Sequence, residues 1–86
     1  LYDDTPDKDE RISTAQAHFD GAIQDLTEVG LEAELGKTLL ARGTFYLELL
    51  RAEEARQDLE TAREMFTRLS MKDSLERAER LLAVLD

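Results

Sequence analysis

Residues 39–62, LLARGTFYLELLRAEEARQDLETA, contain two apolar faces with the spacing of α-helices. Large apolar residues recur at helical intervals in the first half, and small and large apolar residues do so in the second. No part of the stretch alternates apolar and polar residues as a strand does. We therefore predict two helices that meet near residues 50–51. Their faces are marked by Leu35, Leu39, Tyr46 and Leu49, and by Ala52, Ala55, Leu59, Ala62, Phe66 and Leu69.

The same pattern continues on both sides of this stretch. A first helix is predicted to end at Gly30, which suits the position after a helix. The second helix is expected over about residues 32–50. A fourth begins at Asp73, which can act as N-cap with Glu76 as its N3 partner. Short connections favour antiparallel neighbours, so the predicted fold is all-α with about four helices. The apolar face of the first helix consists of Ile12, Ala15, Phe19, Ala22, Leu26 and Val29. The apolar face of the fourth consists of Leu75, Ala78, Leu81, Leu82 and Leu85.

The chain also repeats itself at an offset of forty residues. Small residues fall on small ones and large residues on large ones, and the connection between helices stays in register. A period of this size is typical of stacked helical repeats, in which each hairpin needs a neighbour to bury its apolar face. The matched pairs include Ala15 with Ala55, Phe19 with Leu59, Ala22 with Ala62, and Leu26 with Phe66.

The run Leu39, Gly43, Tyr46, Ala55, Leu59 and Ala62 resembles the tetratricopeptide repeat (TPR). The resemblance implies antiparallel hairpins stacked as an α-α superhelix over residues 11–86. It places Gly43 where two helices of a hairpin touch, Tyr46 between hairpins and Ala55 at a close contact. The chain departs from the pattern where Arg42 replaces Leu, Leu59 an aromatic residue and Thr67 the terminal Pro. The period exceeds the usual value of about 34. With this longer period, the chain is similar to the long repeats of large bacterial regulators. We therefore expect the chain to be the terminal part of such a signalling protein.

Composition excludes several classes of function. Twenty acidic residues against eleven basic ones give a net charge of −9, which disfavours nucleic acid as a partner. There is no cysteine and one histidine, so a thiolate or multi-histidine metal site is not expected. No apolar run approaches the ~20 residues that cross a bilayer. We expect a soluble, cytoplasmic module with an acidic arm at residues 1–10, where Thr5 and Pro6 could start the first helix.

The candidates for chemistry all have simpler structural explanations. His18 has only helix-surface partners such as Asp25, and a catalytic histidine needs a held nucleophile or carboxylate. Gly36-Lys37-Thr38 resembles the end of a P-loop but lacks the leading glycine, so Gly36 is interpreted as a tolerated small residue. The sequence therefore predicts no enzyme, catalytic residue, cofactor or metal. The acidic pairs, which lie adjacent on helices or in the arm, are Asp3/Asp4, Asp9/Glu10 and Glu53/Glu54.

The TPR resemblance also implies a binding groove, since the first helix of each hairpin lines it. The implied groove residues are Lys37, Leu40, Thr44, Leu47, Arg77, Arg80 and Val84. Leu40 and Thr44 replace the Lys and Asn that hold a peptide carboxylate in the family. An apolar centre with a basic edge suits an amphipathic helix with acidic flanks. The expected partner is a protein or peptide, or neighbouring repeats of the same chain.

Two alternatives stay open at this point. The four helices could form a self-associating bundle or homodimer without a separate ligand. The basic residues in the C-terminal half of the chain could also do no more than form surface ion pairs, for example Asp73 with Arg77 and Glu76 with Arg80.

Overall fold

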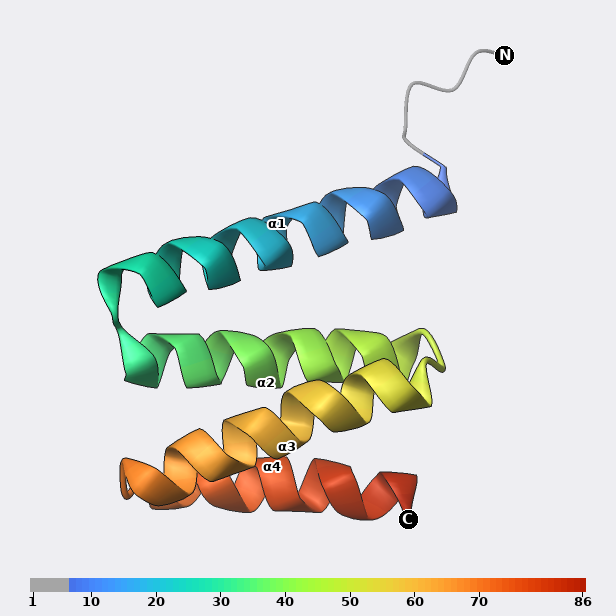
Figure 1. The fold of residues 1–86 in the computed structure, drawn as a ribbon. Helices are drawn as coiled ribbons and strands as arrows, with labels where there is room; N and C mark the ends of the chain where they lie inside the picture. Colours follow the sequence, from blue (N-terminus) through green and yellow to red (C-terminus); the bar gives the residue numbers. More distant parts are fainter. Residues whose placement is uncertain (1–6) are drawn as a thin grey trace.

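The computed structural model describes residues 7–86 and consists of four α-helices, each antiparallel to the next (Figure 1). They are α1 (Lys8–Val29), α2 (Glu32–Glu48), α3 (Ala52–Arg68) and α4 (Lys72–Leu85). No strand occurs in the described residues, so the predicted all-α class is confirmed. α2, α3 and α4 pack together, while α1 contacts α2 alone among the described helices.

The three connections share one backbone geometry at intervals of twenty residues. Gly30, Leu50 and Ser70 all adopt the left-handed conformation, with φ of 77°, 60° and 58°. The residue after each donates its N–H to the carbonyl five residues earlier, as in a Schellman motif. These bonds measure 3.1 Å from Leu31 to Leu26, 2.9 Å from Arg51 to Tyr46 and 2.9 Å from Met71 to Phe66. Gly30 thus ends α1 as predicted, but the other two turns use residues that are not typical terminators.

Leu50 is a turn position where a substitution should stabilise the fold. The left-handed conformation costs a non-glycine residue about 1–2 kcal/mol, and the side chain of Leu50 is 90% exposed. We expect Leu50→Gly to raise the free energy of unfolding by about 0.5–1 kcal/mol, because the greater entropy of unfolded glycine offsets part of the relieved strain. Urea unfolding measures the change. Gly30→Ala, the reverse change in the first turn, should lower stability by about 1 kcal/mol. A less stable Leu50→Gly variant would contradict this explanation.

Two predicted helix starts differ from the structure. α1 begins at Lys8, inside the predicted arm, because the Asp7 carboxylate accepts a hydrogen bond from the Glu10 N–H at 2.7 Å. Thr5 and Pro6 lie outside the described residues. The predicted N-cap at Asp73 is wrong, since α4 begins at Lys72 after Met71 and has no side-chain cap. The common turn geometry sets this start, and Asp73 lies in the first helical turn instead.

The core lies along α3, between α2 and α4. Its centre is the small-large series Ala55, Leu59, Ala62 and Phe66, whose side chains are all 0% exposed. α2 adds Leu39 and Tyr46, and α4 adds Ala78 and Leu82. All six residues that carry the family resemblance are therefore buried.

Glycines at two positions allow α2 to approach α3 closely. A Cβ on Gly43 would lie 2.9 Å from Leu59 Cδ2, and one on Gly36 would lie 2.8 Å from Phe66 Cε1. Real Cβ atoms do not approach other heavy atoms so closely, so a side chain at either position would force Leu59 or Phe66 to shift. Gly36 is thus a packing contact rather than a tolerated small residue. Gly21 on α1 is different, because its Cβ would meet no atom within 4 Å.

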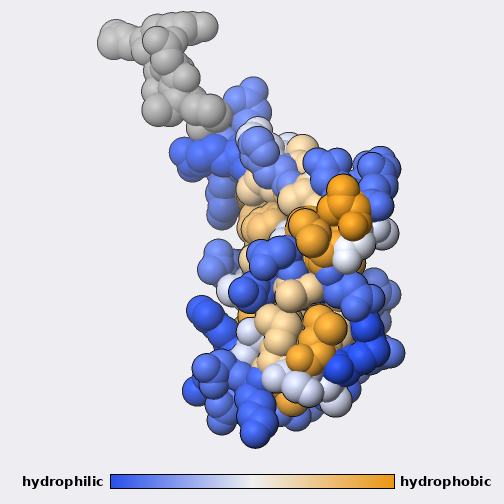
Figure 2. All heavy atoms as spheres, turned by 90° about the vertical axis from the view of Figure 1, so that its left-hand side faces the viewer, coloured by the Kyte–Doolittle hydropathy of each residue, from blue (hydrophilic) through white to orange (hydrophobic). Residues whose placement is uncertain are grey.

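α1 is the least enclosed element of the described chain. It is the outermost helix, flanked by α2 on one side (Figure 1), and none of its residues is buried. Figure 2 views the end at which α1 turns into α2, and hydrophobic side chains there lie open between hydrophilic ones. Val29 and Leu31, on either side of this turn, are both exposed. The predicted apolar face of α1 is therefore present but only half covered.

Candidate functional site

A groove runs between α2 and α4, the two helices that pack against α3. Its pocket has a volume of about 520 Å³. Residues at helical spacing on both helices form the walls, because positions three and four apart share a face. The lining residues are Lys37, Leu40, Ala41 and Thr44 on α2, and Asp73, Ser74 and Arg77 on α4.

The structure brings together four of the seven predicted groove residues: Lys37, Leu40, Thr44 and Arg77. Leu40 is 9% exposed and belongs to the core, so it forms a floor and is not a free anchor as the sequence suggested. The other three lie outside the pocket. Leu47 packs against the core, while Arg80 and Val84 are exposed.

The rim of the groove carries more positive than negative charge. Its lining has two positively charged side chains, Lys37 and Arg77, and one carboxylate, that of Asp73, although the whole chain has a net charge of −9. Within residues 7–86, neither basic side chain is in an ion pair, so the predicted surface pair from Asp73 to Arg77 is not formed. The Thr44 hydroxyl donates to the Leu40 carbonyl at 2.9 Å. Its oxygen is left to accept a hydrogen bond from a ligand.

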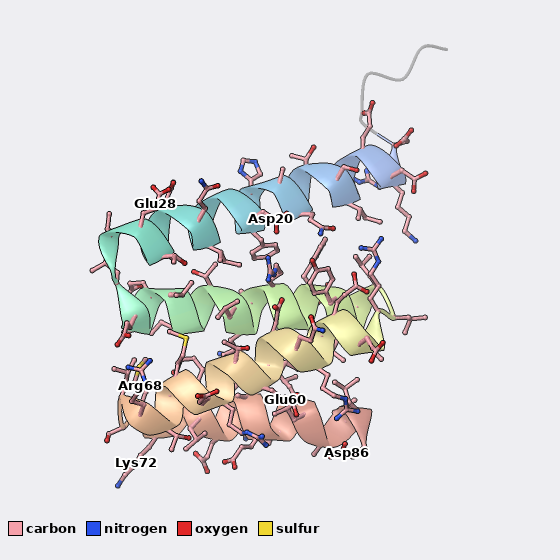
Figure 3. All side chains as sticks on the ribbon, viewed as in Figure 1. Asp20, Glu28, Glu60, Arg68, Lys72 and Asp86 are labelled. Carbon is pink, nitrogen blue, oxygen red and sulfur yellow. The ribbon has the colours of Figure 1, made fainter. Side chains whose placement is uncertain are left out.

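An ion-pair network joins α1, α2 and α3 behind the groove. Arg42 donates to both oxygens of Asp58, from Nε at 2.7 Å and from Nη2 at 2.9 Å. Its Nη1 donates to Asp20 at 2.9 Å, and Figure 3 shows Asp20 pointing from α1 toward α2. Asp58 is 6% exposed, which makes it the buried charge of the described core. This network fixes the positions of three helices relative to one another.

The surroundings of the network shift two pKa values. The hydrogen bonds from Arg42 to Asp58 raise the pKa of Arg42 further above its usual range, so the guanidinium stays charged. Burial raises the pKa of the Tyr46 hydroxyl above its ordinary value. Gln16 on α1 donates to that hydroxyl at 2.8 Å. Tyr46 thus lies between α1 and α2, next to Arg42.

Sequence reasoning noted Arg42 as a departure but missed its partner. Both charged residues fall on apolar faces: Arg42 between Leu39 and Tyr46, and Asp58 three residues after Ala55. Two opposite charges on facing apolar stripes are a signal for a buried pair, because an isolated buried charge is costly. That signal was available in the sequence.

The residues considered for chemistry are not gathered into one site. His18 is exposed on α1, and Glu53 and Glu54 are exposed at the start of α3. Gly36-Lys37-Thr38 is helical, within α2. No group of three or more potential metal ligands occurs in the part of the chain that the structure describes. Asp3 and Asp4 lie outside that part.

Comparisons of the chain with protein-family models, with curated proteins and with solved structures found no match. Among the described helices, none combines the length and apolar character that crossing a bilayer requires.

Proposed function

We propose that this chain is a non-catalytic protein-interaction module of the TPR type, which binds an acidic amphipathic segment of a partner protein in the α2–α4 groove. By the family resemblance, it acts in the cytoplasm as part of a larger bacterial regulatory protein. The observation that carries the proposal is the groove itself, whose rim holds Lys37 and Arg77 over the Leu40 floor.

Charge supports an acidic ligand. The chain as a whole carries a net charge of −9 and repels such a ligand at long range, whereas the two basic side chains at the groove rim attract it. This contrast orients the encounter and favours one docking place over others. The groove also runs along two helices, so a helical segment can place residues one turn apart on its floor.

A defined peptide tests the proposal. The probe is a fluorescent helical peptide of about four turns, with leucines on one face and glutamates beside them. Fluorescence anisotropy measures its affinity for the chain, and a peptide with lysines for glutamates serves as the ligand control. We expect Arg77→Glu to weaken binding of the glutamate peptide by about tenfold, equal to about 1.4 kcal/mol.

The matched protein control is Arg63→Glu, which makes the same charge change on the exposed surface of α3. It should change the affinity by less than about twofold if the effect is local. Equal losses in both variants would show that net charge, and not the groove, drives binding. No effect of Arg77→Glu would place the peptide elsewhere. A dimer of the free chain in sedimentation would favour self-association instead.

A further inference from the structure

The open face of α1 has a buried counterpart in the same molecule. The forty-residue offset matches Ala15, Phe19, Ala22 and Leu26 with Ala55, Leu59, Ala62 and Phe66. The four residues on α3 are 0% exposed between α2 and α4, and two of them, Leu59 and Phe66, lie against Gly43 and Gly36 of α2. Their counterparts on α1 are all partly exposed. α1 therefore carries the face that a helix covers on α3, without that helix among the described residues.

One hydrogen bond on the other side of each of these two helices follows the same forty-residue offset, which supports their equivalence. Gln16 of α1 donates to Tyr46 of α2, and forty residues later Arg56 of α3 donates to Asp86 at the end of α4. α1 thus packs on α2 as α3 packs on α4. Among residues 7–86, no helix lies on α1 in the place that α2 takes on α3.

A pocket marks the place of this missing helix. It has a volume of about 440 Å³ and lies between α1 and α2. It is largely apolar and its lining has no carboxylate, although the chain has twenty acidic residues. The polar groups that it offers are His18, Lys37 and Thr38, and the others are Ala15, Phe19, Ala22 and Ala41.

From this equivalence we infer that the α1–α2 pocket binds an amphipathic α-helix of a partner, which lies antiparallel to α1 and packs as α2 packs on α3. The helix needs small residues seven apart, since Gly36 faces Phe66 and Gly43 faces Leu59 in the internal example. In the partner helix, the two small residues would face Leu26 and Phe19 on α1. This pocket shares Lys37 and Ala41 with the α2–α4 groove, while α1 lines only the former and α4 only the latter. Ala22→Arg on α1 and Arg77→Glu on α4 therefore distinguish the failure of one proposal from the failure of the other.

Charge specifies the helix further. On α3 the buried Asp58 takes Arg42 of α2 as its partner. The counterpart of Asp58 on α1 is His18, which offers no carboxylate for an arginine to pair with. With Lys37 on the opposite wall, the position of Arg42 is better filled by a carboxylate. A second copy is a poor occupant, because the glycine-bearing face of α2 is already buried in each copy.

The probe for this site is a pair of fluorescent peptides. One has the α2 sequence EAELGKTLLARGTFYLE, and the other is the same peptide with Arg42→Glu. We expect the Arg42→Glu peptide to bind the intact chain about fivefold or more tightly than the unchanged peptide in fluorescence anisotropy. The chain variant His18→Asp, which recreates the carboxylate of Asp58, should reverse this preference. If the peptides adhered only non-specifically, His18→Asp would not reverse the preference between them.

Two variants of α1 locate the binding face. Ala22→Arg fills the pocket and should weaken binding of the Arg42→Glu peptide by about tenfold or more. Ala17→Arg makes the same change on an exposed position of the same helix and should leave affinity within about twofold. Circular dichroism checks that both variants keep their helix content. Because His18 is exposed, His18→Asp remains informative if Ala22→Arg perturbs the fold.

Several results would overturn the inference. They are the absence of saturable binding, equal binding to Ala22→Arg and the unchanged chain, or a preference that His18→Asp does not alter. Loss of binding in Arg77→Glu but not in Ala22→Arg would place the peptide in the α2–α4 groove. A dimer of the free chain that Ala22→Arg dissociates would identify a second copy as the occupant.

Discussion

Replacing Arg42 with leucine is expected to lower the free energy of unfolding by about 3–5 kcal/mol. Leucine is apolar and is the residue of the TPR pattern here, so packing alone predicts a neutral or favourable change. The structure predicts the opposite, because the substitution leaves the carboxylate of Asp58 buried without its bidentate partner. Since a chain of this size has a total stability of roughly 4–13 kcal/mol, thermal or urea unfolding should show a large loss.

The double variant Arg42→Leu/Asp58→Leu is the control for this prediction. It removes both charges, and well-packed apolar residues in place of a buried ion pair are often neutral or stabilising. The double variant should therefore regain most of the stability that Arg42→Leu loses. Asp58→Ala alone should cost less than Arg42→Leu, since the Arg42 side chain is 21% exposed and keeps Asp20. A stable Arg42→Leu variant would mean that water reaches Asp58.

Alanine at Gly36 is expected to destabilise the fold although alanine is the better helix former. Helix propensity favours alanine over glycine by about 1 kcal/mol. The new Cβ would lie 2.8 Å from the ring of Phe66, whose side chain is completely buried, so the ring would have to shift within the core. Overpacking of this kind costs about 1–3 kcal/mol. We expect a net loss of about 1–2 kcal/mol for Gly36→Ala, and a loss of the same sign for Gly43→Ala.

Gly21→Ala is the matched control in α1. Its Cβ meets nothing within 4 Å, so the gain in helix propensity is unopposed, and stability should rise by about 1 kcal/mol. Opposite signs for the same chemical change at Gly21 and Gly36 would show that tertiary contacts set the effect. If all three alanine variants were more stable, α2 and α3 would lie further apart than in this structure.

Apolar spacing predicted the helices well because a helical face is a local property. The stripe from Ala55 to Phe66 is the buried face of α3, and Gly30 ends α1 through its left-handed conformation. The turn at Leu50 and the start of α4 were less predictable. Leu50 and Ser70 are held in the left-handed conformation by the packing of the helices that they join, which overrides their own preference.

Four of the seven residues that line the candidate groove were also predictable. Lys37, Leu40, Thr44 and Arg77 come together because the forty-residue repeat places α2 and α4 in equivalent positions. The depth at which each side chain lies was not predictable. Leu40 and Leu47 have the same residue type and similar positions on the α2 stripe. Leu40 nevertheless belongs to the core, while Leu47 is only partly buried.

The sequence by itself determined the number of helices, their apolar faces and the internal repeat, because hydrophobic periodicity and chain connectivity act over short distances. Only the tertiary structure decided three further features: which glycines are contacts, that Asp58 pairs with Arg42, and that α1 keeps an open face. Each of these depends on how closely two helices approach. That distance is set by all the side chains at an interface together.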